Sequence, residues 1–195
     1  MKIFLTVLIL ILSFQSWTKA DDISDFIIEG VSLGDSLFKH YEKDEIKLAE
    51  KTKVTYPNKK FYDIQLDVNN FEVWPLLSFS LKKDEKKQII HALAGGKLMN
   101  IQECKVQKKK IIKDLKSTFF SELKENKYDY IYETIGDGKS IAYISHFVLS
   151  SGSLRVYCTD WSKITEDETG YSDSLRLEIG TIEYFDWLNK KAYSG

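Results

Sequence analysis

Hydrophobic and polar residues alternate along much of the chain with the two-residue period of a β-strand. The clearest case is Lys60–Val68, where every second residue from Tyr62 onward is apolar. Further strands are predicted at Asp25–Glu29, Val73–Lys82, Gln88–Met99, Ser140–Leu149, Leu154–Trp161 and Asp173–Ile179. The Gly95-Gly96 pair predicts a bulge or a bend in its strand. Because short turns join most of these strands, the pattern predicts an antiparallel sheet.

Three other segments carry the period of a helix. Apolar residues recur three and four apart in Ile101–Phe119, and helical signals also run from Asp35 to about Lys51. A final helix is predicted at Ile182–Lys190, with Thr181 as its N-cap. Three strands followed by a helix thus occur twice. We therefore predict one α+β domain, a largely antiparallel sheet with helices packed on one side and a suspected βββα pseudo-repeat.

The start of the chain has the pattern of a secretory signal peptide. A basic residue precedes the apolar run Ile3–Phe14, and small residues occupy the −3 and −1 positions of a cleavage site between Ala20 and Asp21. An uncleaved anchor is the alternative, but a membrane-spanning helix needs about 20 apolar residues and this run is shorter. We expect a signal peptide at 1–20 and one exported domain at 21–195, periplasmic or secreted, with no transmembrane span after cleavage.

Charge argues against nucleic acid as a partner. The chain has 28 basic and 29 acidic residues and a formal net charge of −1, so no strong positive field attracts a phosphate backbone. Loss of Lys2 and Lys19 with the signal peptide makes the mature chain slightly more acidic. All the basic residues are lysine except Arg155 and Arg176. Since arginine is the usual residue for bidentate anion recognition, this bias predicts that the positive charge solvates the surface.

Two cysteines in an oxidising compartment predict a disulfide. Cys104 lies on the apolar face of its predicted helix, and Cys158 shares a strand face with Leu154 and Val156. A Cys104–Cys158 bond would close a loop of about 55 residues, and it would stabilise the fold by up to roughly 4 kcal/mol. Two separately buried free thiols are the alternative. With only three scattered histidines beside them, the cysteines show no metal-ligand spacing, and we predict no metal or cofactor.

One short segment carries the motifs of two hydrolase families. Gly30–Gly34 matches G-x-S-x-G, with Ser32 as the nucleophile. Gly34–Leu37 resembles the block that names the GDSL hydrolases, with Ser36 as the nucleophile. Either serine needs a histidine base, and GDSL enzymes supply it from a D-x-x-H motif that this chain lacks. A tight turn followed by a helix cap explains the same residues. We therefore favour a non-catalytic domain, with a GDSL-like serine esterase as the alternative.

Three further segments are predicted to be structural. Lysines recur along Lys105–Lys116 on the face opposite the apolar stripe, which indicates a solvated helix face. The acidic segment 160–173 lacks the spacing of a calcium loop and predicts an exposed connection. Tyr128, Tyr130 and Tyr132 would share one face of an extended segment. Such a face can stack on sugars or partner proteins, but more often it covers a neighbouring element.

Several stretches resemble a family of small exported bacterial proteins to which no activity is assigned. The resemblance rests on Ile28–Leu37, Phe61–Gln65, Leu154–Ser162 and Glu183–Leu188. It implies an exported α+β domain and supplies no catalytic residues. The opening also resembles small helix-plus-sheet modules of bacterial envelope proteins that act by binding other proteins. We therefore expect an exported binding module, for which an envelope protein is the expected partner.

Overall fold

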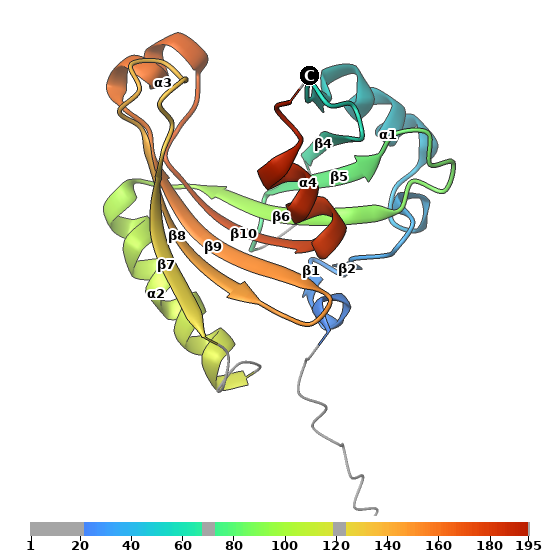
Figure 1. Ribbon diagram of the computed structural model, residues 1–195, viewed down its shortest axis with the longest axis horizontal. Coiled ribbons are helices and arrows are strands. Elements are labelled where there is room, and N and C mark those ends of the chain that lie inside the picture. Colours follow the sequence, from blue (N-terminus) through green and yellow to red (C-terminus); the bar gives the residue numbers. More distant parts are fainter. Residues whose placement is uncertain (1–21, 68–72, 119–123, 195) are drawn as a thin grey trace, which may run out of the picture.

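An eight-stranded antiparallel sheet runs through the structure, a computed structural model that describes residues 22–67, 73–118 and 124–194 (Figure 1). Its strands are β3 (Val54–Thr55), β4 (Phe61–Asp67), β5 (Leu76–Lys82), β6 (Ile90–Leu98), β7 (Glu125–Ile131), β8 (Ile141–Val148), β9 (Gly152–Asp160) and β10 (Ser174–Thr181). The spatial order is β3-β4-β5-β6-β10-β9-β8-β7. The prediction of a single α+β domain built on an antiparallel sheet is confirmed.

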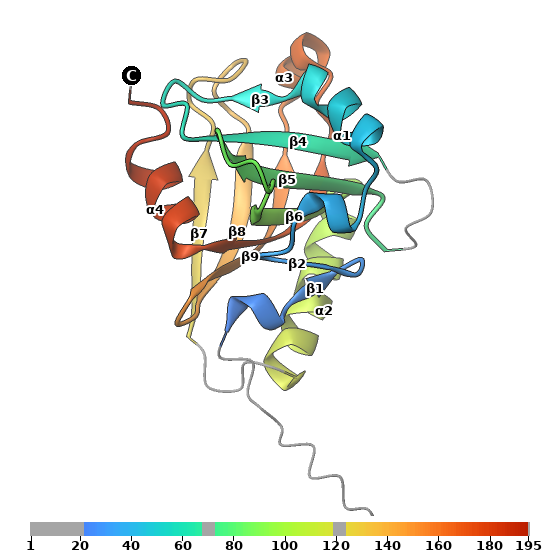
Figure 2. The same ribbon diagram turned by 90° about the vertical axis from the view of Figure 1, so that its right-hand side faces the viewer.

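The sheet is strongly twisted and curved. Figure 2 shows β4 and β5 running across the view while β7 and β8 run upright. Pairing stays in register through Gly95 and Gly96, so of the two alternatives predicted there, a bulge or a bend, the bulge is absent. The register shifts instead between Ser80 and Leu81 of β5. Glycine in a strand can also allow close packing. Here Gly95 lies against Trp74, and Gly96 lies against Leu76 and Arg176 on the other face.

Four α-helices accompany the sheet: α1 (Lys43–Ala49), α2 (Ile101–Thr118), α3 (Lys163–Thr169) and α4 (Ile182–Lys190). The predicted α4 and its N-cap are confirmed, because the Thr181 hydroxyl accepts a hydrogen bond from the Tyr184 backbone N–H. The long helix predicted from Asp35 is wrong. Extended backbone at Ser36 and at Glu42 interrupts it. Only short 3-10 turns at Leu37–Lys39 and Glu50–Thr52 flank α1 there.

Helix α2 covers the convex face of the curved sheet, which we call the outer face; the concave face is the inner face (Figure 1). A disulfide joins Cys104 of α2 to Cys158 of β9, with 5.8 Å between their Cα atoms, and both side chains are buried. The disulfide prediction is therefore confirmed. Because side chains alternate along a strand, Cys158, Val156 and Leu154 all face this side. The residues between them face the opposite side.

Helix α4 packs on that opposite, inner face, and Figure 1 shows the sheet curving around it. Its Phe185 and Tyr184 would contact any side chain added at Gly180 of β10, and Ala92 of β6 lies in the same cluster. The prediction that the helices pack on one side is wrong. Small residues on the inner face leave room for the aromatic side chains of α4. The two successive units of three strands and a helix thus place their helices on opposite faces.

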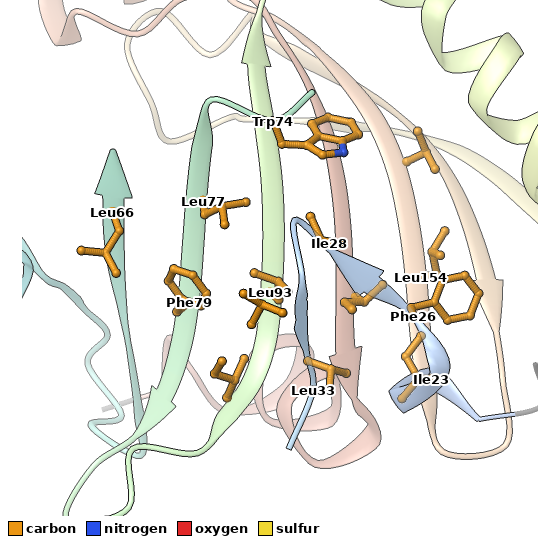
Figure 3. Close-up of a cluster of buried hydrophobic side chains, with 14 of the residues drawn as sticks. Ile23, Phe26, Ile28, Leu33, Leu66, Trp74, Leu77, Phe79, Leu93 and Leu154 are labelled. Atoms are coloured by element: carbon orange, nitrogen blue, oxygen red, sulfur yellow. The ribbon is translucent and has the colours of Figure 1, made fainter. Parts of the chain in front are cut away.

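The N-terminal segment completes the outer face. A 3-10 turn at Ile23–Asp25 leads into a small hairpin of β1 (Ile27–Ile28) and β2 (Val31–Ser32), where a strand at Asp25–Glu29 is predicted from the sequence. Figure 3 shows its apolar side chains lying over the main sheet: Ile23, Phe26, Ile28 and Leu33 against Leu77, Phe79, Leu93 and Leu154. The main hydrophobic core therefore lies between the sheet, this segment and α2.

The acidic segment predicted as a loop contains α3. Ser162 caps its N-terminus by accepting a hydrogen bond from the Thr165 N–H, and Gly170 ends it in the left-handed conformation at φ 73°. Ser162 and Gly170 are typical helix start and stop residues, but the acidic composition between them favoured the prediction of a loop. Among residues 22–67, 73–118 and 124–194, no helix has the length and apolar character needed to cross a membrane.

Candidate functional site

The inner face is hollowed into a cavity of about 730 Å³. Strands β4, β5, β6, β9 and β10 supply its floor, and residues of β3 and of the connection after α3 supply two of its sides. Helix α4 packs against another part of the inner face, around Gly180 and Ala92, which do not line the cavity. The volume is in the range of small-molecule binding sites.

Short side chains make this hollow. Gly96 of β6 lies opposite Arg176 of β10, and Ser78 of β5 lies opposite Ala94. Residues that pair across strands share a face of the sheet, and so do residues two apart in one strand. All four residues therefore lie on the inner face. A Cβ atom at Gly96 would make ordinary contacts with Leu76 and Arg176, the nearest being Leu76 Cβ at 3.6 Å, and Gly96 lines the cavity. Bulky side chains at these positions would occupy the volume of the cavity.

Both arginines of the chain lie on this inner face, on neighbouring strands. The guanidinium carbon of Arg155 lies 4.2 Å from the centre of the Phe185 ring, and Nη2 donates to Asn189 Oδ1 at 3.5 Å. Arg155 therefore anchors α4. Arg176 lines the cavity, where it interacts with the Tyr157 hydroxyl. The interpretation of positive charge as surface solvation is thus wrong for both arginines, because both are partly buried in the inner face.

Asp63 of β4 also lines the cavity. Its Oδ2 accepts a hydrogen bond from the Tyr56 hydroxyl at 2.5 Å, and its Oδ1 is buried with no hydrogen-bond partner in the part of the chain that the structure describes. Burial raises the pKa of Asp63, although the hydroxyls of Ser80 and Tyr56 and the charge of Arg176 oppose the shift. An acceptor without a donor in such a place is costly. The carboxyl group of Asp63 thus makes its interactions within the protein, with the hydroxyls of Tyr56 and Ser80.

A second, partly buried carboxyl lies on the same face, beside the cavity lining. Glu178 of β10 is the cross-strand neighbour of Arg155 of β9. Burial raises the pKa of Glu178, and the positive charges of Arg155 and Arg176 oppose that shift while Asp63 adds to it. Clusters of buried titratable groups with shifted pKa values mark candidate functional sites. The inner face contains such a cluster.

Aromatic side chains form one wall of the cavity. The rings of Tyr132 and Trp161 stack with centroids 4.7 Å apart at 29°, and Tyr171 lies on Trp161 at 4.7 Å and 42°. Tyr132 follows β7, Trp161 follows β9, and Tyr171 follows α3. Burial raises the pKa of Tyr132. Of the three tyrosines predicted to cover a neighbouring element, Tyr132 packs on Trp161 and borders the cavity, whereas Tyr128 and Tyr130 remain 40% and 53% exposed.

The serines predicted as alternative nucleophiles lie elsewhere, near the N-terminal hairpin. The Ser36 hydroxyl donates to the carbonyl oxygen of Lys87 at 2.6 Å. His40 Nε2 is 2.8 Å from Asp35 Oδ2, and the Ser32 backbone N–H donates to the same carboxylate oxygen at 3.3 Å. Within the described ranges, no histidine forms a hydrogen bond with Ser36 or Ser32. The motif thus forms a turn whose polar groups bind one another.

The other predicted site residues are accounted for briefly. Cys104 and Cys158 form the disulfide. The cleavage positions Ala20 and Asp21 lie outside the described residues. Over residues 22–67, 73–118 and 124–194, no group of three or more His, Cys, Asp or Glu side chains is placed to hold a metal ion.

No family model, curated protein or solved structure matches this chain. The role of each residue therefore rests on its surroundings alone. Sequence analysis missed Asp63, Arg176 and Glu178 as site residues. The available signal was charged residues at alternate positions of an apolar strand, where Arg176 and Glu178 interrupt Leu175, Leu177 and Ile179.

Proposed function

We propose that the protein is an exported, non-catalytic binding module that holds its ligand in the inner-face cavity. One observation carries the proposal. The Arg176 guanidinium and the Asp63 carboxyl, from strands that lie three places apart in the sheet, line the same hollow. Neither forms an ion pair with another side chain of the described residues. Polar groups that converge on a cavity are typical of binding sites.

Energetics favour a ligand at this position. A buried polar group without a partner costs about 1–3 kcal/mol, and more when it is charged. Folding alone would therefore favour apolar residues here, as on the outer face of the same strands. A ligand that supplies the missing partners would recover this cost when it binds. The proposal thus explains why the polar residues are placed at the curve of the sheet.

Export supports the same function and is part of the proposal. The predicted signal peptide at 1–20 would deliver the chain to the periplasm or the medium, and a disulfide is typical of such oxidising compartments. The resemblance to small exported bacterial proteins also supports this. An envelope protein is the partner that we propose. Crosslinking in the envelope, followed by mass spectrometry, should recover one partner reproducibly, and repeated failure to do so would contradict this part of the proposal.

Binding in the cavity is tested with N-phenyl-1-naphthylamine, a neutral fluorescent probe of apolar pockets. The protein purified after export should bind it at one saturable site. Gly96→Phe should weaken binding at least tenfold, because its ring occupies the hollow above Gly96. Val106→Phe is the matched control, since it adds the same ring to an exposed position on α2. Absence of binding by the unmodified protein, or equal binding by Gly96→Phe, would contradict the proposal.

A further inference from the structure

We infer that the cavity takes an organic anion, a ligand with one carboxylate or similar acidic group on an apolar, ring-bearing body, and that Arg176 binds the acidic group. This rests on the proposed function and adds the chemical class of the ligand. The inference is carried by the surroundings of Arg176, by the acids near it, and by the character of the walls.

Arg176 is held so that its charged end is free for a ligand. Its Cγ lies 3.9 Å from where a Cβ of Gly96 would be, so the side-chain stem lies along the glycine. The Tyr157 hydroxyl interacts with the guanidinium. A guanidinium has five N–H donors in a planar fork, and one hydroxyl leaves most of them unused. Such a fork matches the two oxygens of a carboxylate.

The acids near Arg176 do not replace a ligand anion. Asp63 and Glu178 are the carboxyl groups that interact with it across the inner face, and neither is within ion-pair distance among the described residues. Asp63 already accepts from Tyr56. Burial raises the pKa of both carboxyls. The Arg176 guanidinium is therefore left to pair with an acidic group of the ligand.

The walls indicate the body of the ligand. Val54, Leu98 and Tyr171 line the cavity and remain 58%, 59% and 48% exposed. Apolar side chains left uncovered around a polar floor are typical of a site that receives an apolar body. A neutral sugar fits less well, because sugars stack on open ring faces and the Trp161 ring already packs against Tyr132 and Tyr171.

The test compares two probes that share one ring system. 8-Anilinonaphthalene-1-sulfonate carries an acidic group, and N-phenyl-1-naphthylamine is the same molecule without it. The unmodified protein should bind the sulfonate at least tenfold more tightly than the neutral probe. Arg176→Met should remove that difference and change the affinity for the neutral probe less than threefold. Lys163→Met, a change at an exposed position on α3, should leave both affinities unchanged.

Folding of the variants is checked by near-ultraviolet circular dichroism. If Arg176→Met does not fold, Arg176→Lys replaces it. That variant keeps the charge and loses the fork, so the sulfonate should bind several-fold more weakly. Equal affinities for the two probes, or a preference that survives both Arg176 substitutions, would overturn the inference while the proposed binding function stands. If neither probe binds the unmodified protein, the proposed function itself is wrong.

Discussion

Gly96 of β6 lies directly opposite Arg176 of β10 on the inner face, whereas Gly95, its neighbour in the chain, faces Trp74 on the outer face. The two consecutive glycines thus serve different purposes. Gly96 makes room for an arginine stem and a cavity. Gly95 lets the Trp74 ring pack against the strand itself.

Alanine substitutions should separate these purposes. A Cβ at Gly95 would lie 2.7 Å from two atoms of the Trp74 ring, whereas a Cβ at Gly96 meets nothing closer than 3.6 Å. Gly95→Ala should therefore destabilise the protein by about 1–3 kcal/mol, the usual cost of overpacking. Gly96→Ala should change stability by less than about 0.5 kcal/mol. Urea unfolding measures both, and similar losses for the two variants would contradict the packing of Trp74.

Reduction of the disulfide should lower stability substantially. Cys104 and Cys158 are 54 residues apart, and the chain-entropy model gives up to roughly 4 kcal/mol for a loop of this length. The double variant Cys104→Ala, Cys158→Ala should therefore unfold at lower urea concentration than the oxidised protein. Dithiothreitol should shift the unmodified protein in the same direction. It should have no effect on the double variant, and an effect there would mean that another process is being measured.

The cap of α4 should contribute measurably. Thr181→Ala removes the oxygen that accepts the Tyr184 N–H, and such losses cost about 1 kcal/mol. Thr181→Ser retains the hydroxyl and should lose much less. The comparison is made by thermal or urea unfolding. A loss in Thr181→Ser as large as that in Thr181→Ala would show that the methyl group, and not the cap, stabilises this end of α4.

Glu178 should make stability depend on pH. Because burial raises its pKa in the folded state, the folded protein binds more protons than the unfolded chain above the unfolded pKa, about 4.3. The contribution of Glu178 is then fully present below pH 4.3 and is lost as pH rises through the folded pKa. Unfolding free energies of the unmodified protein and of Glu178→Gln should be measured from pH 4 upward. Their difference should change with pH in this direction, and a constant difference would contradict the shift.

Ester hydrolysis should not depend on Ser36. Its hydroxyl donates to the Lys87 carbonyl and not to an imidazole, so no group activates it as a nucleophile. The exported protein and Ser36→Ala should release p-nitrophenol from p-nitrophenyl acetate at the same background rate. His40→Gln serves as the parallel variant for the nearby Asp35–His40 pair. Activity that disappears in Ser36→Ala would support the esterase alternative.

Features that depend on short stretches or on the compartment could be predicted from the sequence. The N-cap Thr181 follows from neighbouring residues, and the Cys104–Cys158 bond follows from two apolar faces and an expected oxidising environment. The cavity could not be predicted in this way. Arg176 and Asp63 are distant in the chain, and only the pairing of β6 with β10 brings their strands into one curve. Alternation shows which residues share a face of one strand, but it does not identify the neighbouring strand.

The place of β10 has a consequence for how the protein acquires its shape. This strand is the last in the chain, yet it lies between β6 and β9 in the interior of the sheet. A chain that ends before Ser174 would therefore leave two strand edges without partners, and open edges favour aggregation. The pairing of β10 with β6 joins segments that are far apart in the chain, and long-range pairing of this kind is slow. The sheet thus cannot be assembled before β10 is available to pair with β6 and β9, and the binding hollow forms only with that pairing.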